Sequence, residues 1–287
     1  MLVHCGGCSF GNVVPVRWSR LLVCVAAWGM MGGGAGAAIL MLDFGSASGA
    51  YTGNNSPGHA SGLIASSFTT WQAISGTADG STTDSDANTI NYDLGRAATV
   101  GGSDAGTNVF GAQPTNISAA AGSGIWSTAL TTDAIIDITS ANRRDPVAIR
   151  LSGLAPGTYD AFLVAHDSGN LTIPQQVGYL VSSSAGITSF ASMTGVLTLT
   201  LDADDSQWDE GADYYYVQFT VAAGDSVYFM VNNTDNSGTV VPNNNATISM
   251  LQLTNEPVPE PATLALLSLG GLLVVRRRGR RVPCQRG

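Results

Sequence analysis

Apolar and polar residues alternate in short runs along most of the chain, and long amphipathic helical patterns are absent. Alternation with a period of two puts every second side chain on one face, as in a half-buried β-strand. Turn-forming residues separate several runs, for example Ala155–Gly157 and Asp167–Asn170. The pattern predicts strands over Ile39–Phe44, Ile64–Ile74, Thr89–Leu94, Ala134–Thr139, Val147–Leu151, Thr158–Ala165, Val177–Val181, Val196–Leu201, Tyr214–Val221, Ser226–Val231 and Thr247–Leu253.

Many short strands joined by turns indicate an all-β fold, and we expect an antiparallel β-sandwich of jelly-roll type. The run Leu151–Asp160, LSGLAPGTYD, resembles the turn and strand start of secreted jelly-roll and fibronectin-like modules. The run Thr247–Leu253 resembles the last strand of galactose-binding-like jelly rolls. The stretch Ala97–Gly124 is rich in Gly, Ala, Ser and Asn, and is expected to form a long loop within a single domain.

The N-terminal segment has the features of a secretory signal peptide. Two arginines precede the apolar run Leu21–Ala27, and Ala35 and Ala37 form a small-x-small cleavage site. We expect signal peptidase to cut after Ala37, which removes residues 1–37 and leaves a β-sandwich body over residues 38–255.

The C-terminal residues 256–281 combine three features in a fixed order. A Pro-Glu-Pro signature comes first, an uncharged apolar run over 262–275 follows, and an arginine cluster over 276–281 ends the segment. The residues that carry the signature and the start of the cluster are Pro259, Glu260, Pro261, Arg276, Arg277 and Arg278. This order resembles the PEP-CTERM sorting tail of bacterial surface and matrix proteins, which implies recognition and cleavage by an exosortase-type membrane protease.

The apolar run is short for a permanent membrane anchor. As a helix it would span ~21 Å, against ~30 Å for the hydrocarbon core of a bilayer. We therefore expect the helix over 262–275 to anchor the chain transiently, with the arginines on the cytoplasmic side. The expected location is the cell envelope, the cell surface or the extracellular matrix. An uncleaved single-pass anchor on a surface protein is the alternative.

Composition restricts the partners of the exported body. Between Ala38 and Val258 the chain has no lysine and only four arginines against 20 acidic residues, a net charge near −16. Such a surface repels nucleic acid and anionic membranes, and suits divalent cations, neutral glycans or cationic partners. The cysteines (Cys5, Cys8, Cys24 and Cys284) all lie outside the body, which therefore has neither a disulfide nor a cysteine-based site.

The segment Asp202–Asp213 concentrates six acidic residues within twelve positions. Oxygen-bearing side chains follow the ligand spacing of an EF-hand or dockerin-type calcium loop, at Asp202, Asp204, Ser206, Glu210 and Asp213. Gln207 replaces the glycine of the usual turn, and Asp213 replaces the longer glutamate. Two interpretations stay open, a calcium site that stabilises the body and a solvated acidic loop.

Aromatic residues suggest a second kind of site. Trp208 lies within the acidic loop, where an exposed ring would stack on a sugar of an exopolysaccharide. Trp71 and Trp126 are expected in the core, and His166 is expected at the surface because it ends a strand and enters a turn.

Signs of catalysis are weak. Gly224–Ser226 is similar to the nucleophile block of SGNH-type hydrolases, but no downstream Asp-x-x-His follows, and the simpler interpretation is a turn. A glycosidase needs two carboxylates at a defined separation, and the sequence singles out no such pair. The sequence predicts a non-catalytic structural or adhesive protein, with glycan binding and calcium as open options. A glycan-active hydrolase or lyase is the alternative.

Overall fold

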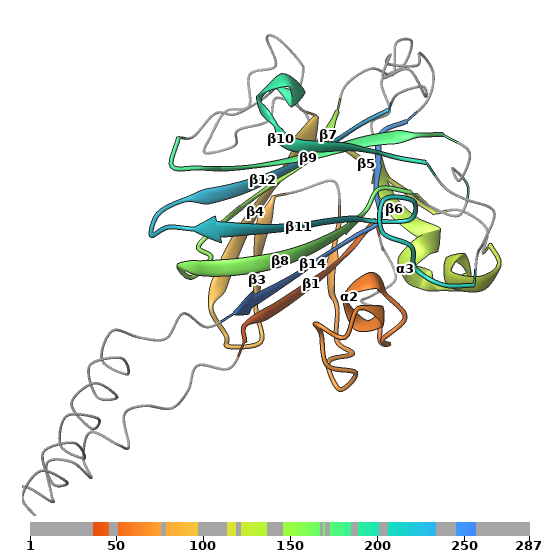
Figure 1. Ribbon diagram of the computed structural model, residues 1–287, viewed down its shortest axis with the longest axis horizontal. Coiled ribbons are helices and arrows are strands. Elements are labelled where there is room, and N and C mark those ends of the chain that lie inside the picture. The colour runs from red at the N-terminus through yellow and green to blue at the C-terminus, as the bar shows by residue number, and fades with distance from the viewer. Residues whose placement is uncertain are drawn as a thin grey trace, which may run out of the picture. The chain divides into compact units, whose positions relative to one another are not determined.

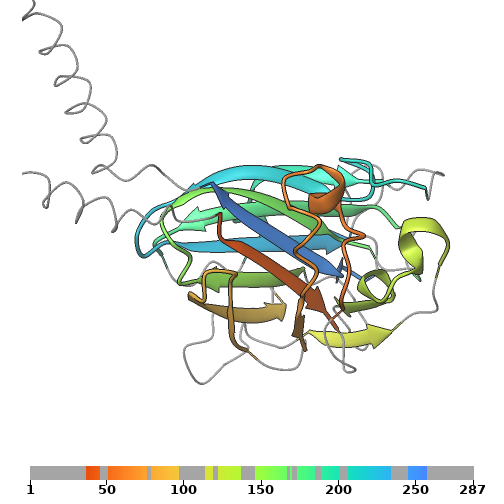
Figure 2. The ribbon, with the colours of Figure 1, turned by 90° about the horizontal axis from the view of Figure 1, so that it is seen from below.

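The computed structural model describes residues 37–45, 51–75, 79–96, 114–118, 122–136, 146–166, 169, 173–184, 189–200, 206–233 and 245–256. Two large β-sheets stack face to face, and a small third sheet lies beside them (Figures 1 and 2). The predicted all-β class, an antiparallel β-sandwich, is confirmed. Gly36–Val258 forms one compact unit. The signal segment, the apolar helix over 262–275 and the arginine cluster lie outside the described residues.

One sheet has five strands in the order β11 (Tyr215–Val221), β8 (Gly157–Val164), β14 (Met250–Glu256), β1 (Ile39–Phe44) and β2 (Gln72–Ile74). Neighbouring strands are antiparallel, except that β2 is parallel to β1. The other sheet has six antiparallel strands in the order β10 (Thr194–Leu199), β9 (Gln175–Ser182), β12 (Ser226–Asn233), β7 (Val147–Ser152), β4 (Thr89–Arg96) and β3 (Gly80–Thr83).

The remaining elements are short. The third sheet contains β13 (Thr247–Ile248), β6 (Asp133–Ile136) and β5 (Thr115–Ser118). The helical turns are α2 (Pro57–Ala60), η1 (Gly124–Ser127), α3 (Ala129–Thr132) and η2 (Phe190–Ser192). No helix among the described residues is both long and apolar enough to cross a membrane. Consecutive strands such as β7 and β8, or β11 and β12, lie in opposite sheets, which is the crossing pattern of jelly-roll sandwiches.

The main core lies between the two large sheets. Alternate residues of each strand face inward, such as Ile149 and Leu151 of β7, which are fully buried. Aromatic rings contact one another across this core, where Phe219 of β11 lies 6.0 Å from Phe229 of β12 between ring centroids. This layer of apolar contacts holds the sandwich together without disulfides.

A second core covers the outer face of the five-stranded sheet. Trp71 and Trp126 are each 1% exposed there and pack with Phe162 of β8. The prediction that both tryptophans are core residues is confirmed. Because both faces of this sheet are covered, β1 is buried along its whole length, which explains its nearly continuous apolar run.

The strand prediction was wrong over most of Ile64–Ile74. Only Gln72–Ile74 is a strand, while Ile64 is buried as part of a turn that follows α2, its N–H donating to the Gly58 carbonyl at 2.9 Å. The structure also adds β3, and it adds β5 inside the predicted loop over 97–124. These two strands are mostly polar, so they lack the apolar alternation that marked the others.

Asp43 is a buried carboxylic acid near the end of β1. It is 1% exposed, its Oδ2 accepts the Tyr51 N–H at 3.2 Å, and its Oδ1 has no hydrogen-bond partner within the described part of the chain. Gly45, just after β1, has φ +88°, and a Cβ there would clash with the Ala134 backbone, so β1 ends tightly against β6. Burial, with a further contribution from Asp133, raises the pKa of Asp43 to about 7.

We predict that Asp43 makes the body less stable as pH rises from about 4 to about 7. Between the unfolded value of 3.8 and the folded pKa of about 7, the native state binds more protons than the unfolded state, so its free energy of unfolding falls. The loss is on the order of 4 kcal/mol at most. Asp43→Asn should flatten this slope in denaturant titrations measured from pH 4 to 8. An unchanged slope in the variant would contradict the assignment.

Candidate functional site

A polar pocket of about 490 Å³ lies against β3, β4 and β7. Four of its residues alternate with core residues along β4 and β7, so their side chains point away from the main core. The strand register places Asp93 opposite Arg150 and Asn91 opposite Ser152. The full lining is Asp79, Gly80, Ser81, Asn91, Tyr92, Asp93, Arg150 and Ser152.

Arg150 is fixed on the pocket floor by contacts across three strands. Its Nη1 lies 3.8 Å from Asp93 Oδ2 on β4, and its Nε donates to Ser226 Oγ on β12 at 3.2 Å. The Arg150 and Asp93 side chains are 21% and 11% exposed, so the pair is largely shielded by the sheet but open on one side. A guanidinium carries five N–H donors, so donors remain for a ligand in the pocket.

Asp79 and Tyr92 form the wall of the pocket at the β3 edge. Asp79 Oδ1 accepts the Leu94 N–H at 2.8 Å, which fixes the carboxylate. Gly80 allows the Tyr92 ring to approach closely, since a Cβ at Gly80 would lie 2.6 Å from the Tyr92 hydroxyl oxygen. Burial, and then the charge of Asp79, raise the pKa of Tyr92, so its hydroxyl stays protonated. Its ring packs against the main core, on the opposite face of β4 from Asn91 and Asp93.

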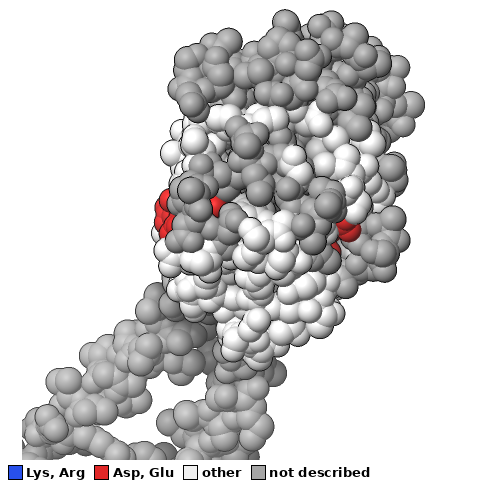
Figure 3. All heavy atoms as spheres, turned by 90° about the vertical axis from the view of Figure 1, so that its right-hand side faces the viewer, with Lys and Arg blue, Asp and Glu red and all other residues white. Residues whose placement is uncertain are grey.

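The pocket therefore offers donors and acceptors to a polar, uncharged ligand. Arg150 and Asn91 donate, Asp79 and Asp93 accept, and the serine hydroxyls do both. Two carboxylates face one guanidinium, so the pocket disfavours anions. The same sign prevails on the face shown in Figure 3, where acidic side chains form two patches and none of the visible described residues is basic.

Trp208, the candidate sugar contact, packs in part against the second core. Its ring is half-buried and packs against Trp126 with centroids 5.6 Å apart, and its Nε1 donates to Asn55 Oδ1 at 3.1 Å. These contacts tie the acidic loop to the second core. Trp208 as a glycan contact stays a prediction, and the open pocket lies elsewhere.

The predicted calcium ligands are only partly described. Ser206 and Glu210 are exposed, whereas Asp213 is 1% exposed and its Oδ2 accepts the Asp209 N–H at 2.8 Å. Asp202 and Asp204 lie outside the described residues. Within the described ranges, no group of three or more His, Cys, Asp or Glu side chains could hold a metal ion. Calcium binding by this loop stays a prediction.

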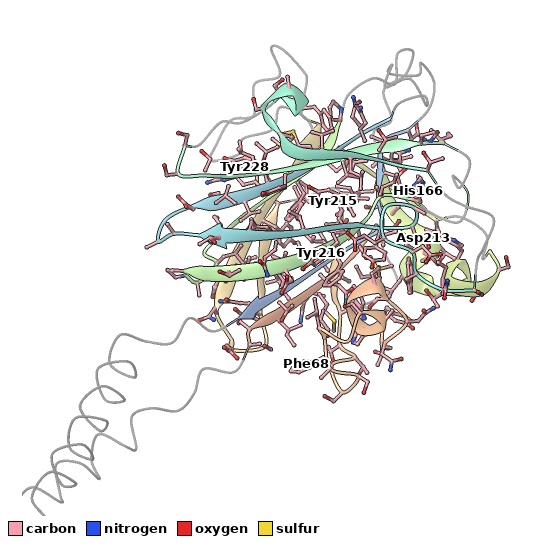
Figure 4. The ribbon with its side chains drawn as sticks, in the orientation of Figure 1. Phe68, His166, Asp213, Tyr215, Tyr216 and Tyr228 are labelled. Atoms are coloured by element: carbon pink, nitrogen blue, oxygen red, sulfur yellow. The ribbon has the colours of Figure 1, made fainter. Side chains whose placement is uncertain are left out.

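His166 lies in the core, where the sequence analysis had placed it at the surface. It is fully buried, and its ring lies edge-on to Trp126 with centroids 6.3 Å apart. The Ser249 hydroxyl donates to the His166 carbonyl. His166 is labelled in Figure 4. His166 follows the end of β8 and is covered by Trp126 of η1, a contact that the local sequence around His166 does not indicate.

The sequence did not indicate the pocket residues, because each occupies a normal polar position in an alternating strand. Asn91 and Asp93 alternate with apolar residues on β4, and Arg150 and Ser152 do so on β7. Alternation could have assigned them to an outer face. Only the pairing of β4 with β7 brings residues about sixty positions apart into one pocket.

Comparison with known proteins identifies the tail. Residues 257–281 match the PEP-CTERM protein-sorting motif, so the predicted tail is confirmed and the chain carries an exosortase sorting signal. No curated protein is similar to the chain. Among solved structures, the chain is similar to the structure of CBM35 from Paenibacillus barcinonensis, with 12% identity and a TM-score of 0.28, over 49% of this chain and 89% of that chain.

We predict that calcium, if the acidic loop binds it, raises the melting temperature of the body. A ligand at about 100 times its Kd adds about 2.7 kcal/mol, which corresponds to about 5–10 °C for a body of this size. Asp204→Asn should abolish the shift, and Asp86→Asn, an exposed turn residue, should keep it. Equal melting curves in calcium and in chelator would leave the acidic loop as a solvated loop.

Proposed function

We propose that the body is a non-catalytic glycan-recognition module with a structural or adhesive role at the cell envelope or in the extracellular matrix. The sorting motif implies an exported protein that exosortase processes. The polar pocket carries the rest of the proposal, since its volume of about 490 Å³ falls within the range of small-ligand sites. Signal peptidase and an exopolysaccharide are the further partners that this proposal implies.

A sugar matches the chemistry of the pocket. Each sugar hydroxyl both donates and accepts, and the fixed pair of Arg150 and Asp93 offers one group of each kind at neighbouring positions. Hydrogen bonds to charged groups are stronger than those between neutral groups. This pair would therefore set how the ligand is oriented in the pocket. The net charge near −16 of the body disfavours nucleic acid as the alternative ligand.

A binding role suits the pocket carboxylates better than catalysis does. A glycosidase acid must keep its proton near neutral pH, which requires a raised pKa. Asp93 is paired with Arg150, and Asp79 accepts the Leu94 N–H, so the protein itself already engages both pocket carboxylates. Asp43 has a raised pKa, but it does not line the pocket.

A hydrolase or lyase is the second candidate, because two carboxylates share one pocket. Long incubation with a polysaccharide panel separates the two functions. A binding module leaves the polymers intact, whereas an enzyme releases shorter chains, and Asp79→Asn or Asp93→Asn should then stop the release.

We predict that Asn91→Ala weakens glycan binding about two- to tenfold, the effect of losing one hydrogen bond. Asn91 is exposed in the pocket, so the fold should tolerate the change. Thr220→Ala, on an exposed position of the opposite sheet, should leave the affinity unchanged. Calorimetric titration with the polysaccharide that binds best measures both variants. Equal affinities for wild type and Asn91→Ala would remove the pocket from the binding site.

We predict that the chain is shortened at its C-terminus in cells that contain an exosortase. Replacing Glu260 and Pro261 with alanine should leave the full-length chain in the membrane fraction, because the signature is lost. Glu256→Ala, just upstream of the matched motif, should be processed normally. Mass spectrometry of the membrane and secreted fractions measures this. Full-length wild-type chain in the membrane fraction would favour the uncleaved single-pass anchor.

A further inference from the structure

The polar pocket is one end of a longer groove. It shares Ser81 and Tyr92 with a middle cavity of about 240 Å³. The middle cavity shares Gln72 and Thr83 with a third cavity of about 270 Å³, which Phe68 lines. The three cavities are therefore neighbours around the side of the sandwich, past the β2 and β3 edges and the turn after β3, and we call this series of cavities the edge groove.

The edge groove passes between the edge strands of the two large sheets. β2 ends the five-stranded sheet and β3 ends the six-stranded sheet, and both strands line the middle cavity. An edge strand presents backbone N–H and C=O groups that no further strand pairs with. Hydroxyl and amide side chains from Gln72, Thr82 and Thr83 add to this polar lining. The groove is thus suited to hydrogen bonding along its length.

Phe68 gives the far end of the groove an aromatic surface. Its side chain is 36% exposed, and Figure 4 shows it on the segment between α2 and β2. Its backbone is held in place, because its N–H donates to the Ala65 carbonyl at 2.9 Å and its carbonyl lies 2.6 Å from His59 Nε2. An exposed ring on a held backbone can stack on the apolar face of a sugar.

The turn across from Phe68 is equally fixed. Asp84 Oδ1 accepts the N–H groups of Asp86 and Asn88 at 3.0 and 2.9 Å, and its Oδ2 accepts Asn88 Nδ2 at 2.9 Å. Ser85 Oγ accepts the N–H of Ile39 at 2.9 Å, which attaches the turn to β1. Hydrogen bonds therefore hold the backbone on both sides of the third cavity, and such preorganisation reduces the entropy lost on binding.

We propose that the edge groove binds an internal stretch of a neutral polysaccharide chain. This inference rests on the proposed glycan-binding function and adds the ligand class. One sugar unit occupies the polar pocket, following units contact the β2 and β3 edges, and a further unit stacks on Phe68. Three carboxylates, Asp79, Asp84 and Asp93, line the groove against Arg150, so the groove selects neutral over anionic chains.

Chain length is the direct test. The full-length protein, kept in a detergent without sugar groups, is titrated with glucan, mannan and xylan ladders of one to six units, and with polygalacturonate oligomers. The six-unit member of one neutral ladder should bind at least tenfold more tightly than its one-unit member. Equal affinity for oligosaccharides of all lengths would contradict binding along the groove, and would leave the polar pocket as a site for a single terminal sugar. Tighter binding of polygalacturonate would overturn the neutral class alone.

Two variants assign the gain in affinity to the groove. Phe68→Ala should weaken six-unit binding about two- to tenfold and leave one-unit binding unchanged. Leu63→Ala is the matched control, because Leu63 is 45% exposed in the same segment but does not line the groove. Asn91→Ala should weaken binding of both the one-unit and the six-unit sugar. A Phe68→Ala variant that binds all lengths like the wild type would refute the Phe68 subsite, and no binding to any ladder would overturn the proposed function itself.

Discussion

The fold depends on burial of the five-stranded sheet on both of its faces. The main core covers one face, and the segments that carry Trp71 and Trp126 cover the other. β1 and β8 are therefore buried along almost their whole length, and burying their polar side chains is costly unless these find partners inside. Asp160 illustrates this, since its Oδ1 accepts both the Tyr216 hydroxyl at 2.7 Å and Gln218 Nε2 at 3.1 Å.

The same constraint determines where a ligand can bind. The second core covers the outer face of the five-stranded sheet. The accessible polar surface therefore lies on the outer face of the six-stranded sheet and along the neighbouring edge strands β2 and β3. The exposed Asn91 lies there, and so does the largely shielded pair of Arg150 and Asp93. An exported body without disulfides thus combines a rigid apolar interior with a polar groove along its side. Its net negative charge favours neutral over anionic ligands.

Most of the strands could be predicted from the sequence because alternation and turn residues act locally. The prediction failed at Ile64, which reaches the second core from a turn, and at β3, whose sequence GSTT has no apolar side chain. Tyr214, Tyr215 and Tyr216 follow this alternation. Tyr214 and Tyr216 both pack near Phe162, and Tyr215 enters the main core on the opposite face, as a period of two requires.

The sequence by itself determined the all-β class, the sorting tail and the absence of disulfides from the body, because each follows from local pattern or composition. The sequence also indicated the acidic loop and Trp208 as candidate sites, because their clustered acidic and aromatic residues lie within one short segment. Tertiary structure alone decided that Trp208 packs on Trp126 and that Asp79, Asn91 and Arg150 share a pocket. Those contacts depend on the register between strands far apart in the chain, which local spacing does not encode.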